Sequence, residues 1–142
     1  MTAYWLVKSE PDAFSWAQQV EHKVEPWTGV RSHEAKKNLL AMRKGDLAFF
    51  YHSNTGKEIV GVVEVAREAY PDPSVDDEAR PGGWVCVDMR AVGPFARPVT
   101  LAELKAAPEF EHLALIRRSR LSVVPVSAAH WARITRLGGY KA

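Results

Sequence analysis

Cysteine is almost absent from this 142-residue sequence, in which Cys86 is the only one. An internal disulfide is therefore excluded, and a reducing compartment is the natural expectation. No apolar run approaches the roughly 20 residues that a membrane span needs, and no basic leader precedes an apolar stretch. We therefore expect no signal peptide, no membrane contact and a cytoplasmic protein, in a bacterial cytosol by preference or in the nucleus of a eukaryote.

A strong charge of one sign is also missing. The chain has 19 basic and 17 acidic side chains and a net charge of +2. Coating of nucleic acid by charge alone is excluded, because non-specific affinity grows with the number of phosphates that the protein neutralises. A local patch beside a pocket is compatible with these totals. Length, and a hydrophobic content of 46%, predict one globular domain over residues 1–142.

Motifs of catalysis and metal binding are absent as well. The sequence has no nucleophile elbow, P-loop or dinucleotide fingerprint. His52 and Ser53 are neighbours on a predicted strand, so their side chains point to opposite faces, and nothing in the sequence brings Ser9 to His52. The histidines lack metal-ligand spacing; they are His22, His33, His52, His112 and His130. We predict no catalytic residues, no metal and no cofactor.

The N-terminal stretch is the most informative part of what is present. Tyr4, Trp5, Leu6 and Val7 have high strand preference, and Pro11 ends the strand. Between them stand a cation, a hydroxyl and a carboxylate, in Lys8-Ser9-Glu10. A hydrophobic strand that delivers unlike polar groups at its end is a common way to place recognition chemistry at a sheet edge.

The remaining elements predict a small mixed sheet. Gly61 is expected to mark a bulge or a close approach within its strand. Strands are expected over residues 46–53, 58–69, 84–92 and 119–126. Helices are expected over 12–20, capped by Asp12, over 32–44, capped by Ser32, after a capping box at 100–103, over a turn or two of 109–117, and after Ser127. Connectors are expected over 21–26, 70–83 and 94–98. About five strands with inserted helices favour an α+β barrel.

Aromatic and basic residues next to turns are candidate contacts for nucleic acid. Trp27 precedes a predicted helix start and Arg31; it is either a lid on the core or a wall on which a base stacks. Arg117, Arg118 and Arg120 stand within four residues, as a solvated face or as a phosphate-binding patch.

Several stretches together make the chain resemble the EVE domain family. They are Tyr4-Trp5-Leu6-Val7-Lys8-Ser9-Glu10-Pro11, Trp27-Thr28-Gly29-Val30-Arg31, Met42-Arg43-Lys44-Gly45-Asp46, Phe50-Tyr51-His52-Ser53, Ile59-Val60-Gly61-Val62-Val63-Glu64-Val65, Tyr70-Pro71-Asp72-Pro73, Arg97-Pro98-Val99-Thr100-Leu101 and Ser119-Arg120-Leu121-Ser122. The resemblance implies a PUA-like mixed β-barrel of about five to six strands with helices around it. It also implies a distant relation to YTH domains and a reader of modified bases, with 5-methylcytosine and 5-hydroxymethylcytosine in DNA as the favoured ligands.

The resemblance also implies a set of site residues. It places a base-binding pocket at Lys8, Ser9, Glu10, Trp27, Thr28, Arg31, Ser32, Tyr51, His52 and Ser53. It places the phosphate or nucleic-acid surface at Lys57, Arg117, Arg118, Ser119 and Arg120. One departure is Ser32-His33, where the family usually has asparagine followed by an aromatic residue. Serine is shorter and has one hydroxyl in place of the amide, so either the ligand differs or water fills the gap.

The hypothesis is that the modified base leaves its stack and is captured in an aromatic pocket. Two alternatives stay open: a PUA-like binder of modified or structured RNA, and an enzyme that acts on a modified nucleotide. The expected partner is nucleic acid, with DNA favoured, and the expected state is a monomer that acts alone or with an effector protein.

Overall fold

The computed structural model describes residues 2–74 and 83–140. Within these residues six strands form one mixed sheet in the order β2-β5-β4-β3-β1-β6. The strands are β1 (Tyr4–Ser9), β2 (Val24–Pro26), β3 (Leu47–His52), β4 (Glu58–Pro71), β5 (Val85–Thr100) and β6 (Val123–Val126). The helices are α1 (Trp16–His22), α2 (His33–Ala41), α3 (Leu101–Ala106), the 3-10 helix η1 (Pro108–Phe110), α4 (Ala114–Arg117) and α5 (Ala128–Leu137). The predicted α+β class and mixed sheet are confirmed.

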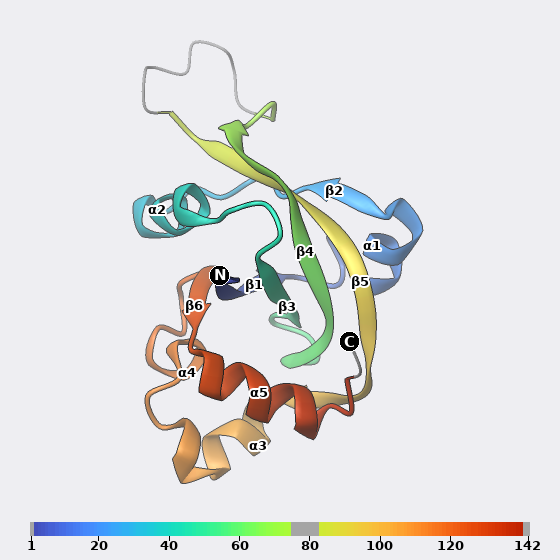
Figure 1. Ribbon diagram of the computed structural model, residues 1–142, viewed down its shortest axis with the longest axis vertical. Coiled ribbons are helices and arrows are strands. Elements are labelled where there is room, and N and C mark those ends of the chain that lie inside the picture. Colours follow the sequence, from blue (N-terminus) through green and yellow to red (C-terminus); the bar gives the residue numbers. More distant parts are fainter. Residues whose placement is uncertain (1, 75–82, 141–142) are drawn as a thin grey trace.

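The long strands β4 and β5 form the spine of the molecule (Figure 1). Figure 1 shows α3, α4 and α5 gathered at one end of the sheet. Helix α2 lies toward the opposite end. Strands β1 and β3 run parallel, while the other neighbouring pairs are antiparallel. No helix among the described residues is long and apolar enough to cross a membrane.

Strand β3 is buried on both faces, and this divides the core into two parts. Phe49 stacks on Trp131 of α5, with ring centroids 3.9 Å apart. Its neighbour Phe50 points to the opposite face and contacts Trp16 and Trp27 edge-on, at 5.3 and 5.5 Å. Trp27 is therefore part of the second core, which lies between β3 and the segment that links α1 to α2.

The starts of three helices were predicted correctly, whereas the predicted end of the second helix at 44 was wrong: α2 ends at Ala41, because Met42 has an extended backbone with a ψ of 141°. Ser32, Thr100 and Ser127 cap α2, α3 and α5, and each side chain accepts a backbone N–H of the first turn. Gly61 is also confirmed as a close approach, since a Cβ atom there would lie 2.6 Å from the ring of Trp16. The ladder shifts register beside it, between β4 and β5.

The first helix begins later than predicted. Asp12 lies in a turn in which the carbonyl of Glu10 accepts the N–H groups of Ala13 and Phe14. Ser15 caps α1 in its place, in a reciprocal capping box with Gln18. The expected cap at Asp12 was wrong because the turn competes with the helix for the same backbone groups.

Other boundaries also differ from expectation. The expected connectors at 94–98 and 21–26 contain strand instead: β5 continues to Thr100, with Pro94 opposite Gly61, and β2 pairs with β5. Bulges in the ladder accommodate the prolines, which donate no hydrogen bond. Strand β4 extends to Pro71, β6 begins only at Val123, and 75–82 of the expected loop lies outside the described residues.

Candidate functional site

A cavity of about 680 Å³ opens where the ends of β1 and β3 meet the segment after β2. Six of the predicted pocket residues line it: Lys8, Ser9, Glu10, Trp27, Thr28 and Ser53. Ser119 and Arg120, predicted for the nucleic-acid surface, line it as well. Sequence reasoning missed Ala13, Phe14, Glu25, Pro26, Gly29, Asn54 and Ser122, of which Pro26, Gly29 and Asn54 are next to predicted site residues in the sequence.

The parallel pairing of β1 and β3 positions the rim of the cavity. Parallel strands end at the same edge of a sheet, and here Ser9 lies opposite His52. The Ser53 N–H donates to the Ser9 carbonyl at 2.9 Å. On the other side of β1, the Lys8 N–H donates to the Ser122 carbonyl at 3.0 Å. Residues far apart in the sequence thus form one rim.

The polar side chains of the rim are held by hydrogen bonds. The Lys8 ammonium donates to the Ser119 carbonyl at 2.9 Å, and its partial burial lowers the pKa of this amine. The Ser9 hydroxyl donates to the carbonyl of Phe14. The Glu10 carboxylate accepts a hydrogen bond from the Asn54 amide. These contacts orient a cation, a hydroxyl and a carboxylate around the opening.

Trp27 forms an inner wall of the cavity. Only 7% of this residue is exposed, since Phe14 and Phe50 contact its ring edge-on, at 6.2 and 5.5 Å. The backbone N–H of Trp27 donates to the Val87 carbonyl of β5 at 2.7 Å. The ring therefore presents a narrow part of its surface to the cavity, and Phe14 adds a second aromatic contact.

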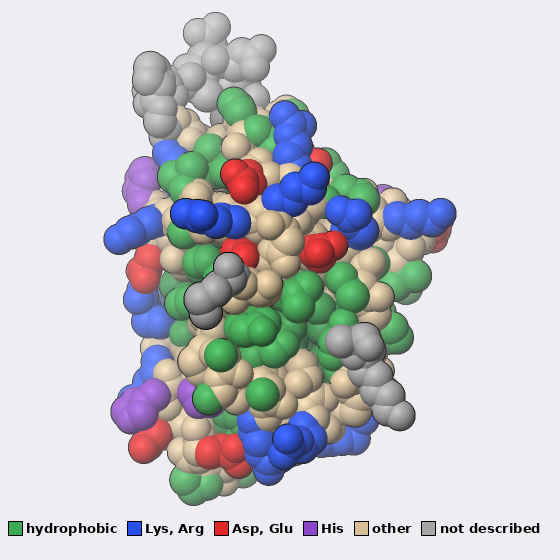
Figure 2. All heavy atoms as spheres, in the orientation of Figure 1, with side chains coloured by type: hydrophobic (Ala, Val, Ile, Leu, Met, Phe, Trp, Pro, Cys, Tyr) green, Lys and Arg blue, Asp and Glu red, His purple; other side chains and the backbone are tan. Residues whose placement is uncertain are grey.

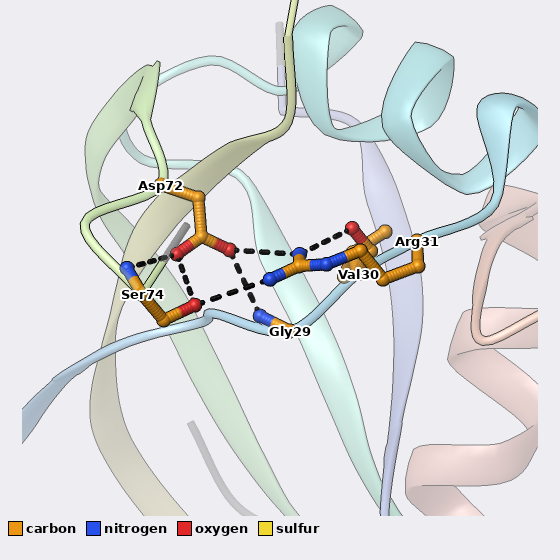
Figure 3. Close-up of polar contacts among 5 residues, drawn as sticks. All are labelled: Gly29, Val30, Arg31, Asp72 and Ser74. Atoms are coloured by element: carbon orange, nitrogen blue, oxygen red, sulfur yellow. Dashed lines mark hydrogen bonds and ion pairs between the residues drawn. The ribbon is translucent and has the colours of Figure 1, made fainter. Parts of the chain in front are cut away.

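The backbone beside Trp27 is anchored by Asp72, which follows β4 (Figure 3). One carboxylate oxygen accepts the Gly29 N–H at 2.9 Å and the Arg31 guanidinium at 3.2 Å. The other accepts the N–H and the hydroxyl of Ser74, at 2.7 and 2.6 Å. Gly29 has a φ of +87°, a conformation that favours glycine. The wall of the cavity is thereby tied to the end of β4.

Asp72 carries this role as a buried carboxylate. Its side chain is 0% exposed, whereas that of Arg31 is 42% exposed. Burial raises the pKa of Asp72, but the hydrogen bonds from Ser74, Gly29 and Arg31 outweigh that effect and hold the pKa below its usual value. The only sequence signal for Asp72 was its place in the stretch Tyr70-Pro71-Asp72-Pro73.

Four predicted pocket residues do not line the cavity. Arg31 binds Asp72 and the carbonyl of Val30. Tyr51 is 4% exposed. The Nε2 atom of His52 accepts a hydrogen bond from the backbone N–H of Trp16 at 3.0 Å, and burial lowers the pKa of this imidazole.

Ser32, the fourth of these residues, lines a smaller depression of about 360 Å³. The other residues of this depression are Glu34, Arg117, Arg118, Ser119, Arg120 and Leu121. The structure therefore brings four of the five predicted surface residues together around it. The fifth, Lys57, lines neither hollow; its carbonyl accepts the N–H of Leu101.

Charge over the surface is mixed. Figure 2 shows the Lys and Arg side chains of one face in separate groups, with Asp and Glu side chains between them. Among residues 2–74 and 83–140, no group of three His, Cys, Asp or Glu side chains is placed to hold a metal ion. The lining of the main cavity combines the charged side chains of Lys8, Glu10, Glu25 and Arg120 with hydroxyl groups and the aromatic rings of Phe14 and Trp27.

Comparison with known proteins gives the following matches. Residues 3–137 match the EVE domain. Human thymocyte nuclear protein 1 is 31% identical in an alignment of 157 positions, which covers 89% of this chain and 70% of that protein. The NMR structure of Rpa0253 from Rhodopseudomonas palustris is 54% identical, with a TM-score of 0.91 over 99% of this chain and 96% of that one. The crystal structure of human THYN1 in complex with 5-methylcytosine-containing DNA is 29% identical, with a TM-score of 0.89 over 99% and 100%.

Proposed function

The chain belongs to the EVE domain family, and from this premise we propose that it binds nucleic acid and captures a modified base in the cavity beside Trp27. One observation carries the proposal: a solved relative of the same fold, aligned over nearly the whole chain, is in complex with 5-methylcytosine-containing DNA. A cavity of about 680 Å³ is within the range of ligand pockets in proteins. DNA is the favoured partner, with 5-methylcytosine or 5-hydroxymethylcytosine as the base.

Capture begins when the base leaves its stack, at a cost of roughly a few kcal/mol. The exposed part of Trp27 and the ring of Phe14 offer apolar contact that offsets this cost. Lys8, Ser53 and Thr28 line the cavity and supply polar groups for the edge of the base. Lys8 already donates to the Ser119 carbonyl, and its ammonium has two further N–H groups to offer. In this proposal Ser9, whose single hydroxyl hydrogen is donated to Phe14, and Glu10, which is bonded to Asn54, shape the rim.

The methyl group contributes little by burial alone. One buried methyl adds ~0.8 kcal/mol, or about fourfold in affinity. Stronger discrimination must come from the shape of the cavity, whose wall at residues 27–31 is held by Asp72. In this proposal Arg31 contributes to recognition through the wall and not by touching the base.

A catalytic step is not part of the proposal. The Ser9 hydroxyl donates to the Phe14 carbonyl, and the Nε2 atom of His52 accepts the backbone N–H of Trp16. These bonds use the two groups that an acid–base mechanism would need. Modified RNA is the second candidate ligand, and the same experiment tests it.

The experiment is an anisotropy titration with labelled oligonucleotides that carry cytosine, 5-methylcytosine or 5-hydroxymethylcytosine, single- and double-stranded, with N6-methyladenine RNA as comparison. Trp27→Phe and Ser53→Ala alter the cavity. Trp27→Phe is preferred to alanine, because truncating a buried tryptophan costs about 3–5 kcal/mol of stability. Lys105→Met on α3 is the control, since that side chain lines neither hollow.

We expect a preference for one modified base that Trp27→Phe and Ser53→Ala reduce and Lys105→Met preserves. A 2-aminopurine beside the modified position reports unstacking, and its fluorescence should rise on binding. Equal affinity for modified and unmodified oligonucleotides would refute base capture. A stronger preference for the RNA would make RNA the ligand of the same cavity.

A further inference from the structure

The smaller depression adjoins the base cavity, because Ser119 and Arg120 line both. Arg117, Arg118 and Arg120 all line this smaller hollow. Within residues 2–74 and 83–140, neither Arg117 nor Arg120 forms an ion pair. A strand whose base enters the cavity would place its neighbouring phosphates close to these guanidinium groups.

Arg118 differs from the other two arginines because a carboxylate already occupies its guanidinium. Nη1 donates to one oxygen of Glu34 at 2.7 Å, and Nη2 donates to the other oxygen. This two-pronged contact joins residues 84 positions apart in the sequence and lies in the lining of the depression. The Arg118 hydrogen bond lowers the pKa of Glu34, so this carboxylate is ionised at neutral pH.

A carboxylate and a phosphate compete for the same arginine geometry. Both present two oxygens to the parallel N–H groups of a guanidinium, and both bind it in a two-pronged manner. The side chains of Arg118 and Glu34 are 51% and 46% exposed, so water screens their attraction and the pair is easily opened. Nothing buried has to move when Glu34 leaves.

We propose that Glu34 stands in for a backbone phosphate in the free protein, and that a nucleic-acid strand bound in the base cavity displaces it from Arg118. The proposal rests on the proposed function, because it takes nucleic acid as the ligand of the adjacent cavity. Glu34 is then an internal competitor that weakens binding to phosphate backbones of every sequence. Glu34 therefore affects the affinity for the sugar–phosphate backbone and not the choice of base.

The test is Glu34→Gln, which removes the charge and keeps the size of the side chain. Binding is measured by anisotropy with a short single-stranded oligothymidine and with the cytosine and 5-methylcytosine oligonucleotides, over a series of salt concentrations. We expect affinity for all of them to rise about three- to tenfold at low salt. The slope of log K against log salt should steepen by up to about 0.7, the value for one phosphate on a single strand, because in wild type the displaced Glu34 takes up a cation that offsets the one released by the phosphate.

Two variants separate the local effect from that of net charge. Glu109→Gln removes a carboxylate that binds Arg133 at 2.9 Å, away from both hollows, and makes the same change in net charge. We expect it to change affinity less than twofold. In an Arg118→Gln background, Glu34→Gln should lose most of its effect, because the two groups act as a pair.

The inference is overturned if Glu34→Gln and Glu109→Gln act alike, if the salt slope stays unchanged, or if no variant binds any oligonucleotide. If Glu34→Gln raises affinity for every oligonucleotide and no modified base is preferred, the role of Glu34 is supported and base capture is refuted. A preference for a modified base, with Glu34→Gln inert, would leave the proposed function standing and refute the role of Glu34.

Discussion

Replacement of Asp72 by alanine tests whether one buried carboxylate holds the cavity wall in place. The change removes the acceptor of four hydrogen bonds, from Gly29, Arg31 and two groups of Ser74. Loss of one partner of a buried charged network costs about 3–5 kcal/mol. Because the Arg31 side chain is 42% exposed and water can hydrate its charge, we expect the lower end, about 3 kcal/mol.

The assay is urea unfolding at pH 7, followed by circular dichroism. Asp12→Ala is the matched control, because Asp12 is an exposed carboxylate in a turn, and changes at such sites stay within about 0.5 kcal/mol. A loss of less than about 1 kcal/mol for Asp72→Ala would refute the anchoring argument. A normal stability together with an unchanged preference for modified bases would further remove Asp72 from any account of the site.

Acid also weakens this anchor. The folded state holds the pKa of Asp72 below its usual value, so the unfolded chain binds the proton more tightly. The stabilisation is therefore complete above the pKa of the unfolded chain, about 4, and is lost as pH falls through the lower pKa of the folded state. The unfolding free energy of wild type should fall as pH drops below about 4, and Asp72→Ala should lack the part of this fall that comes from Asp72.

The remaining predictions concern the core and a histidine. Gly61→Ala should destabilise the protein by about 1–3 kcal/mol in the same assay, because the new Cβ would lie 2.6 Å from the Trp16 ring; a neutral change would show that α1 moves freely. Burial lowers the pKa of His52, which accepts the Trp16 N–H, so its stabilisation is complete above pH ~6.5 and is lost as pH falls through the folded-state pKa. His52→Gln keeps an acceptor and should reduce the dependence of the unfolding free energy on pH below about pH 6.5; a pH profile identical to that of wild type would contradict this.

The sequence by itself determined the features that depend on a few neighbouring residues. Ser32, Thr100 and Ser127 cap helices because a side-chain oxygen reaches an N–H two or three residues away. The stretch at 4–11 was predicted as a strand that ends in polar groups, and Lys8, Ser9 and Glu10 do line the cavity. The family could also be predicted, because its stretches occur in order along the chain.

Only the tertiary structure decided which distant groups meet. Asp72 reaches Gly29 across 43 positions, and Arg118 reaches Glu34 across 84, so neither contact has a local pattern. The burial of Trp27 depends on Phe50, whose direction is set by the register of β3. Caps and turns depend on contacts between residues that are close in the sequence. The cavity, in contrast, forms where the ends of two parallel strands meet, and the pairing of these strands depends on the whole sheet.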